Sequence, residues 1–306
     1  MRITTSMVQR NVLADLNSLS EKLAKTQSKA SSGKQITRPS DDPYNTARAM
    51  GLRQTMDAND QYKRNIEDSQ GWQDSTESSL DSITQYVNRA QSLLLEGSTD
   101  TADAGARASI AAEIDQIIQG VKETANATYG DSYLLSGTAT NVAPYVLGDD
   151  DTYQGNDAGL DPTVPGVIRE IGPGVTMSIN MVGHEILGDG RANPGDGKLL
   201  NALRDISDHL KAGDGNALRN DTSALQNQLN TLLDVRARNG AMTNRLQAAD
   251  ARLDQIQGAV NEQLSNTEDA DLAKTLIEFN QQQAAYQASL RAGANIVQSS
   301  LMDFLK

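Results

Sequence analysis

The feature that most constrains the fold of this 306-residue sequence is a seven-residue repeat of apolar positions, present on both sides of a segment rich in glycine and proline. Alternating steps of three and four residues place side chains on one face of an α-helix and are typical of helices that pack along their length. The C-terminal row is Leu225, Leu232, Asn239, Leu246, Leu253 and Val260, and a more polar row runs from Leu52 to Leu94. The repeat therefore predicts two long, paired helices.

Capping and breaking residues predict where the helices begin and end. A first, shorter helix should stop at Gly33, because glycine is a common residue just past a helix C-terminus. Two acidic residues before Pro43 predict the start of a second helix that reaches about Gly97, and a third should cover residues 104–129. Thr267-Glu268-Asp269 predicts the N-terminal cap and first turn of a final helix that runs to Lys306.

The middle of the chain has a different composition. Five of the seven prolines and thirteen of the 24 glycines lie between Gly130 and Gly197. Within this segment, Val164–Ile171 and Val175–Val182 are short apolar runs separated by turn residues, which is typical of strands joined by tight turns. We expect a small β-rich insert at the tip of a helical hairpin.

Together these patterns predict a mainly α fold with a small β-rich insert, arranged as an elongated antiparallel rod, a coiled-coil-like hairpin with both termini at one end. Three parts are expected. Residues 1–42 and 266–306 form terminal assembly helices, residues 43–138 and 191–265 form a long-helix rod, and residues 139–190 form the outer insert. Asn59 and Asn239 fall within apolar rows, where a buried asparagine could fix the register of the helices; exposure to solvent is the alternative.

Composition excludes several functions. The net charge of −13, with basic residues scattered singly, argues against binding to nucleic acid, and no apolar run approaches the ~20 residues of a membrane span. The chain has no cysteine, and its start lacks the apolar stretch of a cleaved secretory signal. We therefore expect no membrane segment, no disulfide and no cysteine nucleophile.

Candidate chemical motifs are incomplete. His184-Glu185 begins like a zinc-protease motif, but Gly188 stands where the second histidine is needed, so His184 is expected to be a loop histidine. The run Asp149-Asp150-Asp151 lacks the glycine and glutamate of a calcium loop and is expected to be a solvated acidic turn. His209 is expected to form a solvated pair with Asp208. No catalytic, metal-binding or cofactor-binding residue is predicted.

The informative residues are apolar and terminal. Two helices at the end of a rod can bury only one face each on one another, so we expect the remaining apolar groups to contact other copies or other subunits. We also expect residues 1–40 and 266–306 to be poorly ordered or only loosely helical in the free monomer, because their seams lack an intramolecular partner. Packing onto the body of the monomer is the alternative. The predicted assembly interface comprises Val12, Leu16, Leu19, Leu23, Leu272, Leu276, Phe279, Leu290, Val297, Leu301 and Phe304.

Four segments resemble the bacterial flagellin superfamily. They are the opening MRITTSM, the stretch KASSGKQITRPSDDP at residues 29–43, YLLSGT at residues 133–138, and the C-terminal DADLAKTLIEFNQQQAAYQASLRAGANIVQSSLMDFL at residues 269–305. Within the superfamily, the two ends look most like the members that join the flagellar hook to the filament. The middle of the chain is not matched by this resemblance.

The resemblance implies a structural protein and no enzyme. It implies export by the flagellar type III apparatus with a dedicated chaperone, and assembly outside the cell into a ring of copies between hook-associated protein 1 and flagellin. Terminal helices would line the inner tube, and the insert would project outward. The alternative is a short flagellin that forms the filament itself. The two differ in self-assembly, because only a flagellin should polymerise alone into long filaments.

Overall fold

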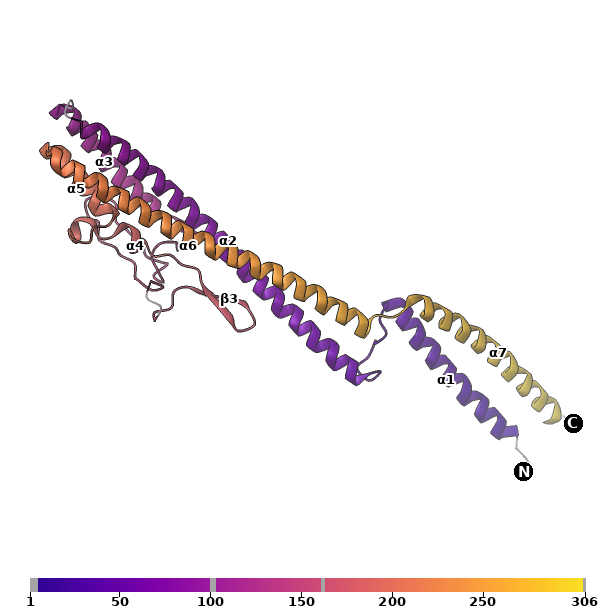
Figure 1. The fold of residues 1–306 in the computed structure, drawn as a ribbon. Helices are drawn as coiled ribbons and strands as arrows, with labels where there is room; N and C mark the ends of the chain where they lie inside the picture. Colours follow the sequence, from indigo (N-terminus) through magenta and orange to yellow (C-terminus); the bar gives the residue numbers. More distant parts are fainter. Residues whose placement is uncertain (1–4, 100–102, 161–162, 305–306) are drawn as a thin grey trace. The chain divides into compact units, whose positions relative to one another are not determined.

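The structure is a computed structural model and describes residues 5–99, 103–160 and 163–304. It is mainly α-helical, as predicted (Figure 1), and it contains two small antiparallel sheets. The helices of the described chain are α1 (Thr5–Ser32), α2 (Pro43–Gly97), α3 (Ala104–Ala125), α4 (Gly183–Leu187), the 3-10 turn η1 (Gly190–Ala192), α5 (Leu199–Ala212), α6 (Gly215–Glu268) and α7 (Leu272–Phe304). The strands are β1 (Thr128–Tyr129) paired with β2 (Ser132–Tyr133), and β3 (Ile168–Gly172) paired with β4 (Val175–Ser178).

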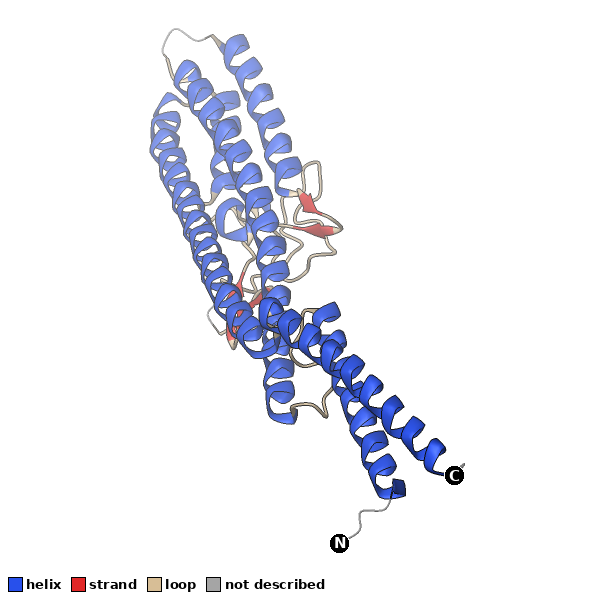
Figure 2. Ribbon diagram, turned by 90° about the vertical axis from the view of Figure 1, so that its right-hand side faces the viewer, coloured by secondary structure: helices blue, strands red, loops and turns tan. Residues whose placement is uncertain are grey.

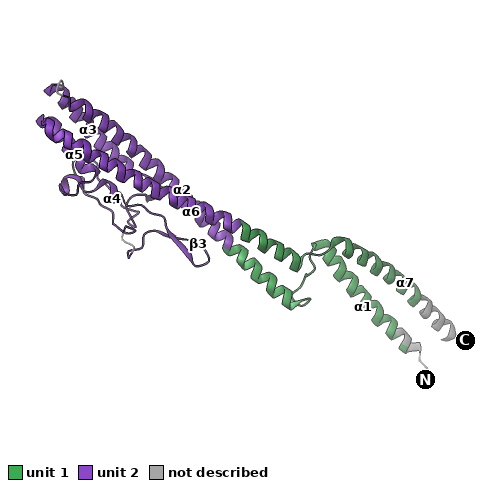
Figure 3. Cartoon of the chain, viewed as in Figure 1, with its two compact units in different colours: residues 1–58, 255–306 green, residues 59–254 purple. Residues whose placement is uncertain are grey.

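The chain divides into two compact units (Figure 3). Unit 1 consists of residues 1–58 and 255–306 and contains α1 and α7. Unit 2 consists of residues 59–254 and contains α3, α4, α5 and all four strands. The predicted division into three parts at residues 42, 138, 190 and 265 stays a prediction.

The helix boundaries set by glycine and proline are confirmed. Gly33 follows the last residue of α1 with φ at +70°, a left-handed conformation that glycine adopts without strain, and its amide donates to Lys29 O at 2.9 Å. The helix α2 begins at Pro43, and the Asp42 carboxylate accepts the amide of Asn45 at 3.0 Å. Both ends of the first connection are therefore encoded locally.

The predicted third helix is too long. It ends at Ala125, because Asn126 uses both ends of its side-chain amide to bind the backbone of Tyr145, with distances of 2.7 and 3.0 Å. This contact turns the chain out of the helix, and Thr128–Tyr129 pairs as a strand instead. A partner nineteen residues away ends the helix, and the local sequence does not show it.

The predicted strands are also too long. Only Ile168–Gly172 and Val175–Ser178 pair as strands, around a turn at Pro173 and Gly174, and Asn180 ends the ladder, while Val182 forms an isolated bridge with Ser136. The Asn180 side chain accepts the amide of Val167 at 2.9 Å and donates to Ala158 O at 2.8 Å, so it replaces backbone pairing with side-chain bonds. Most of the insert is therefore irregular chain held by specific hydrogen bonds.

The insert lies along the flank of the long helices of unit 2 and not at their tip, which corrects the prediction (Figures 1 and 2). Asn65, in the middle of α2, donates to Glu170 O at 2.8 Å, and Gln73 donates to Ile179 O at 2.6 Å. Insert residues also belong to the main hydrophobic core, together with residues of α2, α3, α5 and α6. The insert contributes Tyr145, Ile179, Met181, Ile186 and Leu187 to this core.

Asn59 and Asn239 are buried, with exposed fractions of 2% and 1%. The amide nitrogen of Asn239 lies 3.2 Å from Gln73 O, across the α2–α6 pair, while its carbonyl oxygen is buried without a hydrogen-bond partner. A polar residue at such a position specifies register at a cost in stability. The burial therefore agrees with a register function for Asn239.

Asn239→Leu is expected to raise the melting temperature by a few degrees. The substitution removes an unpaired buried carbonyl and creates no new buried orphan. Of the two acceptors of the Asn239 amide, Gln73 O belongs to a helical ladder, and Glu77, whose Oε2 lies 3.3 Å from Asn239 Nδ2, is also bound to Arg236. A gain of about 1 kcal/mol corresponds to roughly 2–4 °C in a domain of this size. Thermal unfolding followed by circular dichroism measures it, with the exposed Asn227→Leu as the control. A lower melting temperature would show that the bonds of Asn239 contribute net stability.

Candidate assembly interface

The helices α1 and α7 pack antiparallel against one another within unit 1 (Figure 3). Near one end of the pair, the Thr26 hydroxyl donates to Gln282 Oε1 at 2.8 Å. Near the other end, a β-carbon added to Gly293 would lie only 3.2 Å from Val12 Cγ1. The glycine thus permits close approach of the two backbones. The expectation that these seams lack a partner within the chain is wrong, because each helix is the partner of the other.

The α1 face of this seam is the one that the sequence predicts. Val12, Leu16, Leu19 and Leu23 are half-buried, and Thr26 is buried. On α7 the seam consists of Thr275 and Gly293, which are buried, and of Phe279, Gln282, Tyr286 and Ser289, which are half-buried. Of the predicted interface residues, the structure therefore brings together Val12, Leu16, Leu19, Leu23 and Phe279.

A second apolar row on α7 remains exposed. Leu272, Leu276 and Leu290 have exposed fractions of 50%, 52% and 46%, and they lie beside the seam and not in it. Ile277, further around the helix, is 59% exposed. Exposed apolar side chains that gather on one side of a helix are typical of surfaces that bind another protein. The side chains of Val297, Leu301 and Phe304 lie outside the described part of the chain.

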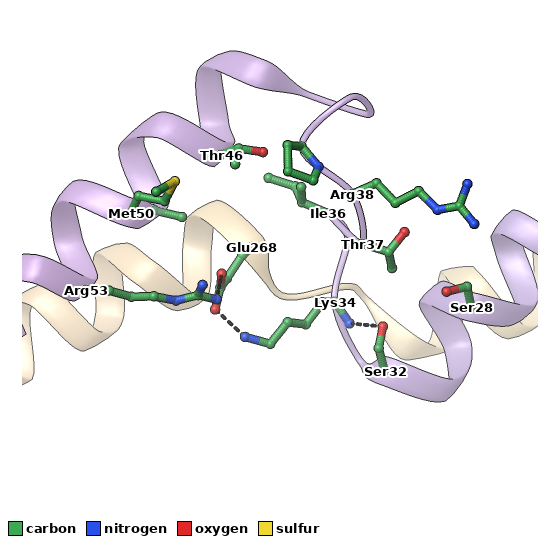
Figure 4. A pocket seen from close by; sticks show the side chains of 12 residues that line it. Ser28, Ser32, Lys34, Ile36, Thr37, Arg38, Thr46, Met50, Arg53 and Glu268 are labelled. Carbon is green, nitrogen blue, oxygen red and sulfur yellow. Dashed lines mark hydrogen bonds and ion pairs between the residues drawn. The ribbon is translucent and has the colours of Figure 1, made fainter.

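The predicted start of the last helix is wrong. The helix α6 continues through Thr267 and ends at Glu268, and α7 begins at Leu272, where the Asp271 carboxylate accepts the amide of Lys274 at 3.1 Å. Glu268 is therefore not a first-turn residue. Its carboxylate is bound by Lys34 and Arg53 and is only 7% exposed (Figure 4).

The charge of Glu268 is stabilised by these two cations. Burial by itself raises the pKa of the Glu268 carboxyl, but the hydrogen bonds from Lys34 and Arg53 outweigh burial and leave the pKa below its ordinary value. The sequence predicts a first-turn position for Glu268 because an acidic residue after a capping threonine fits that role. Its partners Lys34 and Arg53 lie more than 200 residues away and give no local signal.

Side chains of the incomplete chemical motifs form hydrogen bonds and ion pairs within the fold. His184 lies in the short helix α4 and not in a loop, with Asp157 at 2.9 Å from its Nδ1. His209 pairs with Asp221 at 2.7 Å and not with Asp208. The acidic run is only partly solvated, because the Asp149 side chain is 96% exposed while Asp151 is fully buried against Lys122 and Arg204.

The described residues contain neither a metal-binding cluster nor a membrane-spanning helix. No cluster of three or more histidines, cysteines or carboxylates is arranged to hold a metal ion. Among the helices in the described ranges, none combines the length and the apolar character needed to cross a membrane.

Amides of α1 between Leu16 and Ala30 are expected to exchange roughly a hundredfold faster than those of α2 between Leu80 and Leu94. The α1 seam is mostly half-buried, whereas Leu80, Ile83 and Leu94 are 0% exposed in the main core. Since local opening requires less burial to be lost in α1, its protection should be lower. Hydrogen exchange at monomeric concentration measures both segments in one sample. Equal protection would contradict this expectation.

Family models match both ends of the chain, and individual relatives match nearly its whole length. The family model of the bacterial flagellin N-terminal helical region matches residues 3–140, and that of the C-terminal helical region matches residues 222–305. Hook-associated protein 3 of Escherichia coli is 28% identical over 100% of both chains, and that of Salmonella typhimurium is 26% identical over 98% of both. A flagellin of Halalkalibacterium halodurans is 24% identical over 92% of this chain and 91% of its own.

Solved structures share the fold. A flagellar hook-associated protein of Vibrio parahaemolyticus aligns with a TM-score of 0.62, at 21% identity, over 75% of this chain and 100% of its own. Hook-associated protein 3 of Legionella pneumophila aligns with a TM-score of 0.61, at 11% identity, over 71% of this chain and 98% of its own. The helical architecture described above is therefore the one found in these proteins.

Proposed function

The chain belongs to the bacterial flagellin family and is a structural protein of the flagellum, and from this premise we propose that it joins the flagellar hook to the filament. One observation carries the proposal. Hook-associated protein 3 of Escherichia coli matches this chain over the full length of both proteins, including the central segment that the two family models leave out. The chain acts as a structural adaptor and not as an enzyme.

In this function the chain has hook-associated protein 1 on the hook side and flagellin on the filament side, and it forms a ring with further copies of itself. Its terminal segments, residues 1–42 and 266–306, build the inner tube, residues 43–138 and 191–265 form the surrounding layer, and residues 139–190 face outward. The protein is secreted through the flagellar type III apparatus after release from an export chaperone that binds the C-terminal helix.

The surface that supports this proposal is the exposed apolar row of α7. Leu272, Leu276 and Leu290 are about half exposed in the single chain, although each could bury a large apolar area. Burial of this row against neighbouring subunits would stabilise the assembled state without any change in the α1–α7 seam. Both helices of the pair can then act as one unit in assembly.

Deletion of the gene tests the proposal in the cell. We expect hooks to remain, filaments to be absent, and flagellin to be shed into the medium, because the subunits on either side are made but not joined. Complementation with the parent gene should restore filaments. Normal filaments in the deletion strain would exclude the junction function.

The alternative, a short flagellin, is favoured by the match to flagellins over more than nine tenths of this chain. It is tested with the purified protein. A flagellin should polymerise into long filaments on its own when seeded, whereas a junction protein should stop at short assemblies or stay monomeric. Electron microscopy of seeded samples separates the two, and long filaments of the pure chain would favour the alternative.

A further inference from the structure

One side of the long helix α6 carries a row of arginines. Arg238, Arg245 and Arg252 recur every seven residues, so they lie nearly above one another along the helix, and all three are exposed. Arg238 binds the Glu185 carboxylate of the insert. Within the residues that the structure describes, Arg245 and Arg252 have no ion-pair partner. Two guanidinium groups of the row are therefore available to carboxylates from outside the chain.

Small residues lie between these arginines on the same side of the helix. Ala241 follows Arg238 by three positions, Ala248 follows Arg245 by three, and both alanines are exposed. We call the three arginines together with Ala241 and Ala248 the arginine row. A guanidinium group can bind a carboxylate through two parallel bonds, and the alanines leave room for aliphatic groups between the charges. The row thus fits a partner that offers both.

The insert has the opposite character. Residues 139–190 contain eight acidic residues and a single basic residue, Arg169. Of the nine large apolar side chains that are exposed in the described part of unit 2, seven belong to the insert. Exposed apolar groups that gather in one region are typical of surfaces that bind another protein. The insert therefore combines the two features that the arginine row fits.

One loop of the insert presents both features side by side. Val146 and Leu147 are 50% and 53% exposed, and the Asp149 side chain is 96% exposed. The Asp149 carboxylate lies 3.9 Å from the Arg204 guanidinium, which is already bound by the buried Asp151. We call Val146, Leu147 and Asp149 the knob. Its charge and its aliphatic groups are left largely unused by the fold of the chain itself.

The backbone of the knob is nevertheless held firmly. The Gln119 side chain donates to Gly148 O and accepts the Gly148 amide, both at 2.9 Å. The buried Lys122 ammonium donates to Gly148 O at 2.8 Å and to Asp150 O at 2.7 Å. A loop that is fixed before it binds loses little conformational entropy on binding. The knob is thus a preorganised protrusion on the surface of unit 2.

The knob and the arginine row are complementary, but they do not meet within one chain. Both belong to unit 2, and the free guanidinium groups of Arg245 and Arg252 show that Asp149 of the same chain is not bound there. Two different complementary surfaces on one chain produce a head-to-tail contact, which repeats from copy to copy and closes into a ring or continues as a helix. The partner that fits is therefore a second copy.

We propose that the knob of one copy docks on the arginine row of the neighbouring copy. Asp149 then lies between Arg245 and Arg252, and the two aliphatic side chains of the knob pack on the alanines of the row. Copies of a chain with a net charge of −13 repel one another, and this contact brings the acidic insert of one to the basic row of the next. Its place in the ring at the hook–filament junction rests on the proposed function.

Disulfide cross-linking tests the contact in assembled flagella. The chain has no cysteine, so two introduced thiols report on one contact only. Flagella from cells that express the chain with Leu147→Cys and Ala248→Cys are isolated and oxidised. We expect a ladder of dimers, trimers and larger multimers, because each copy offers one thiol to each of two neighbours. Disulfides require Cα atoms within about 7 Å, so the ladder reports direct contact.

The matched control moves one thiol along the same helix. Ala224 is exposed and lies 24 residues before Ala248 on α6, a distance of about 36 Å. The chain with Leu147→Cys and Ala224→Cys should give no ladder under the same oxidation. Chains with Leu147→Cys or Ala248→Cys alone should give none either, because the docked thiol then meets no second one.

Charge reversal and its rescue test the chemistry of the contact. In the chain with Leu147→Cys and Ala248→Cys, Arg245→Glu should lower the yield of multimers about tenfold, because an attractive pair becomes a repulsive one. Adding Asp149→Arg should restore the yield, since the pair is rebuilt with its signs exchanged. Arg219→Glu changes an exposed arginine of α6 outside the row and should leave the yield unchanged. Thermal unfolding of the purified variants verifies that each is folded.

Some reversed chains could also fail to enter the flagellum. Loss of incorporation with Arg245→Glu that Asp149→Arg restores supports the contact in the same way as a restored yield. Loss that Asp149→Arg does not restore counts against it. Secretion of each variant into the medium is measured in parallel, so that an export defect is recognised.

Three results would overturn the proposal. They are the absence of a ladder in flagella that contain the chain with Leu147→Cys and Ala248→Cys, an equal ladder in the Ala224→Cys control, and dimers without larger multimers, which indicate a two-fold contact. Failure of the proposed function is a separate result. It would appear as normal filaments in the deletion strain and would leave the cross-links between copies in isolated flagella in place.

Discussion

Asp151→Asn is expected to lower the free energy of unfolding by about 3–5 kcal/mol, the cost typical of removing one partner from a buried ion pair. Asp151 and Lys122 are both 0% exposed, and Arg204 is 5% exposed. The carboxylate accepts from Arg204 through two bonds of 2.9 Å and from Lys122 at 3.1 Å. Asparagine is nearly the same shape but leaves two buried cations without an anion between them.

The control for this substitution is its neighbour. The Asp149 side chain is 96% exposed and lies 3.9 Å from the Arg204 guanidinium, so Asp149→Asn should not change the stability measurably. Denaturant unfolding of the two variants and the parent measures the difference. A loss of less than about 1 kcal/mol in Asp151→Asn would contradict the buried position of this carboxylate.

The ion pairs of Asp151 also predict that the stability lost in Asp151→Asn depends on pH. Burial raises the pKa of the Asp151 carboxyl, but the bonds from Arg204 and Lys122 outweigh it, so the pKa in the folded protein lies below the ordinary 3.8. The stabilisation is therefore complete above the unfolded pKa and is lost as the pH falls through the folded value. The difference in the free energy of unfolding between the parent and Asp151→Asn should become smaller below about pH 4. A difference in the free energy of unfolding that stays constant down to about pH 2 would contradict this prediction.

Leu290→Asp is expected to abolish motility while barely changing the stability of the free protein. Leu290 is 46% exposed in the single chain, so the new carboxylate stays hydrated there. In an assembled structure that buries this row, an unpaired carboxylate would cost several kcal/mol. Complementation of the deletion strain measures the effect, with secretion into the medium followed in parallel to separate assembly from export. The sequence alone predicts the same loss for Leu301→Asp.

Ala288→Asp is the matched control for Leu290→Asp. Ala288 is exposed and lies two residues earlier, about 200° around the helix, so the substitution places an equal charge on a different side of α7. It should leave motility intact. Normal motility with Leu290→Asp at normal expression would show that the exposed row is not an assembly surface. Loss of motility with both variants would indicate a general effect of acidic charge on α7.

Local signals predicted the end of α1, the start of α2 and the α1 seam well. Gly33 and Pro43 act through their own backbone geometry, so no distant residue is needed to interpret them. The row Val12, Leu16, Leu19 and Leu23 is the only apolar row on α1 of that length, and it is the face that packs. Apolar periodicity is sufficient to predict the packed face of a helix where one row of residues is apolar and the others are polar.

On α7, apolar periodicity did not separate the row of residues that packs on α1 from the exposed row beside it. Apolar residues lie on adjacent rows there, and the row that packs contains Thr275 and Gly293, a polar residue and a residue without a side chain, which carry no hydrophobic signal. Long-range partners explain the other differences. Asp151 is buried because of Lys122 and Arg204, and Glu268 because of Lys34 and Arg53, at separations of 29 to 234 residues. Such pairs are properties of the fold and cannot be inferred from spacing.

The turn between β3 and β4 offers a place to label the protein. A side-chain atom added at Gly174 would meet nothing within 4 Å, whereas one at Gly188 would lie 2.2 Å from the Asp196 carboxylate. A peptide tag inserted between Pro173 and Gly174 would therefore lengthen an open turn, at an entropic cost of about 0.6 kcal/mol for each doubling of loop length. A fluorescent or antibody-binding tag carried there should make the protein visible on living, swimming cells.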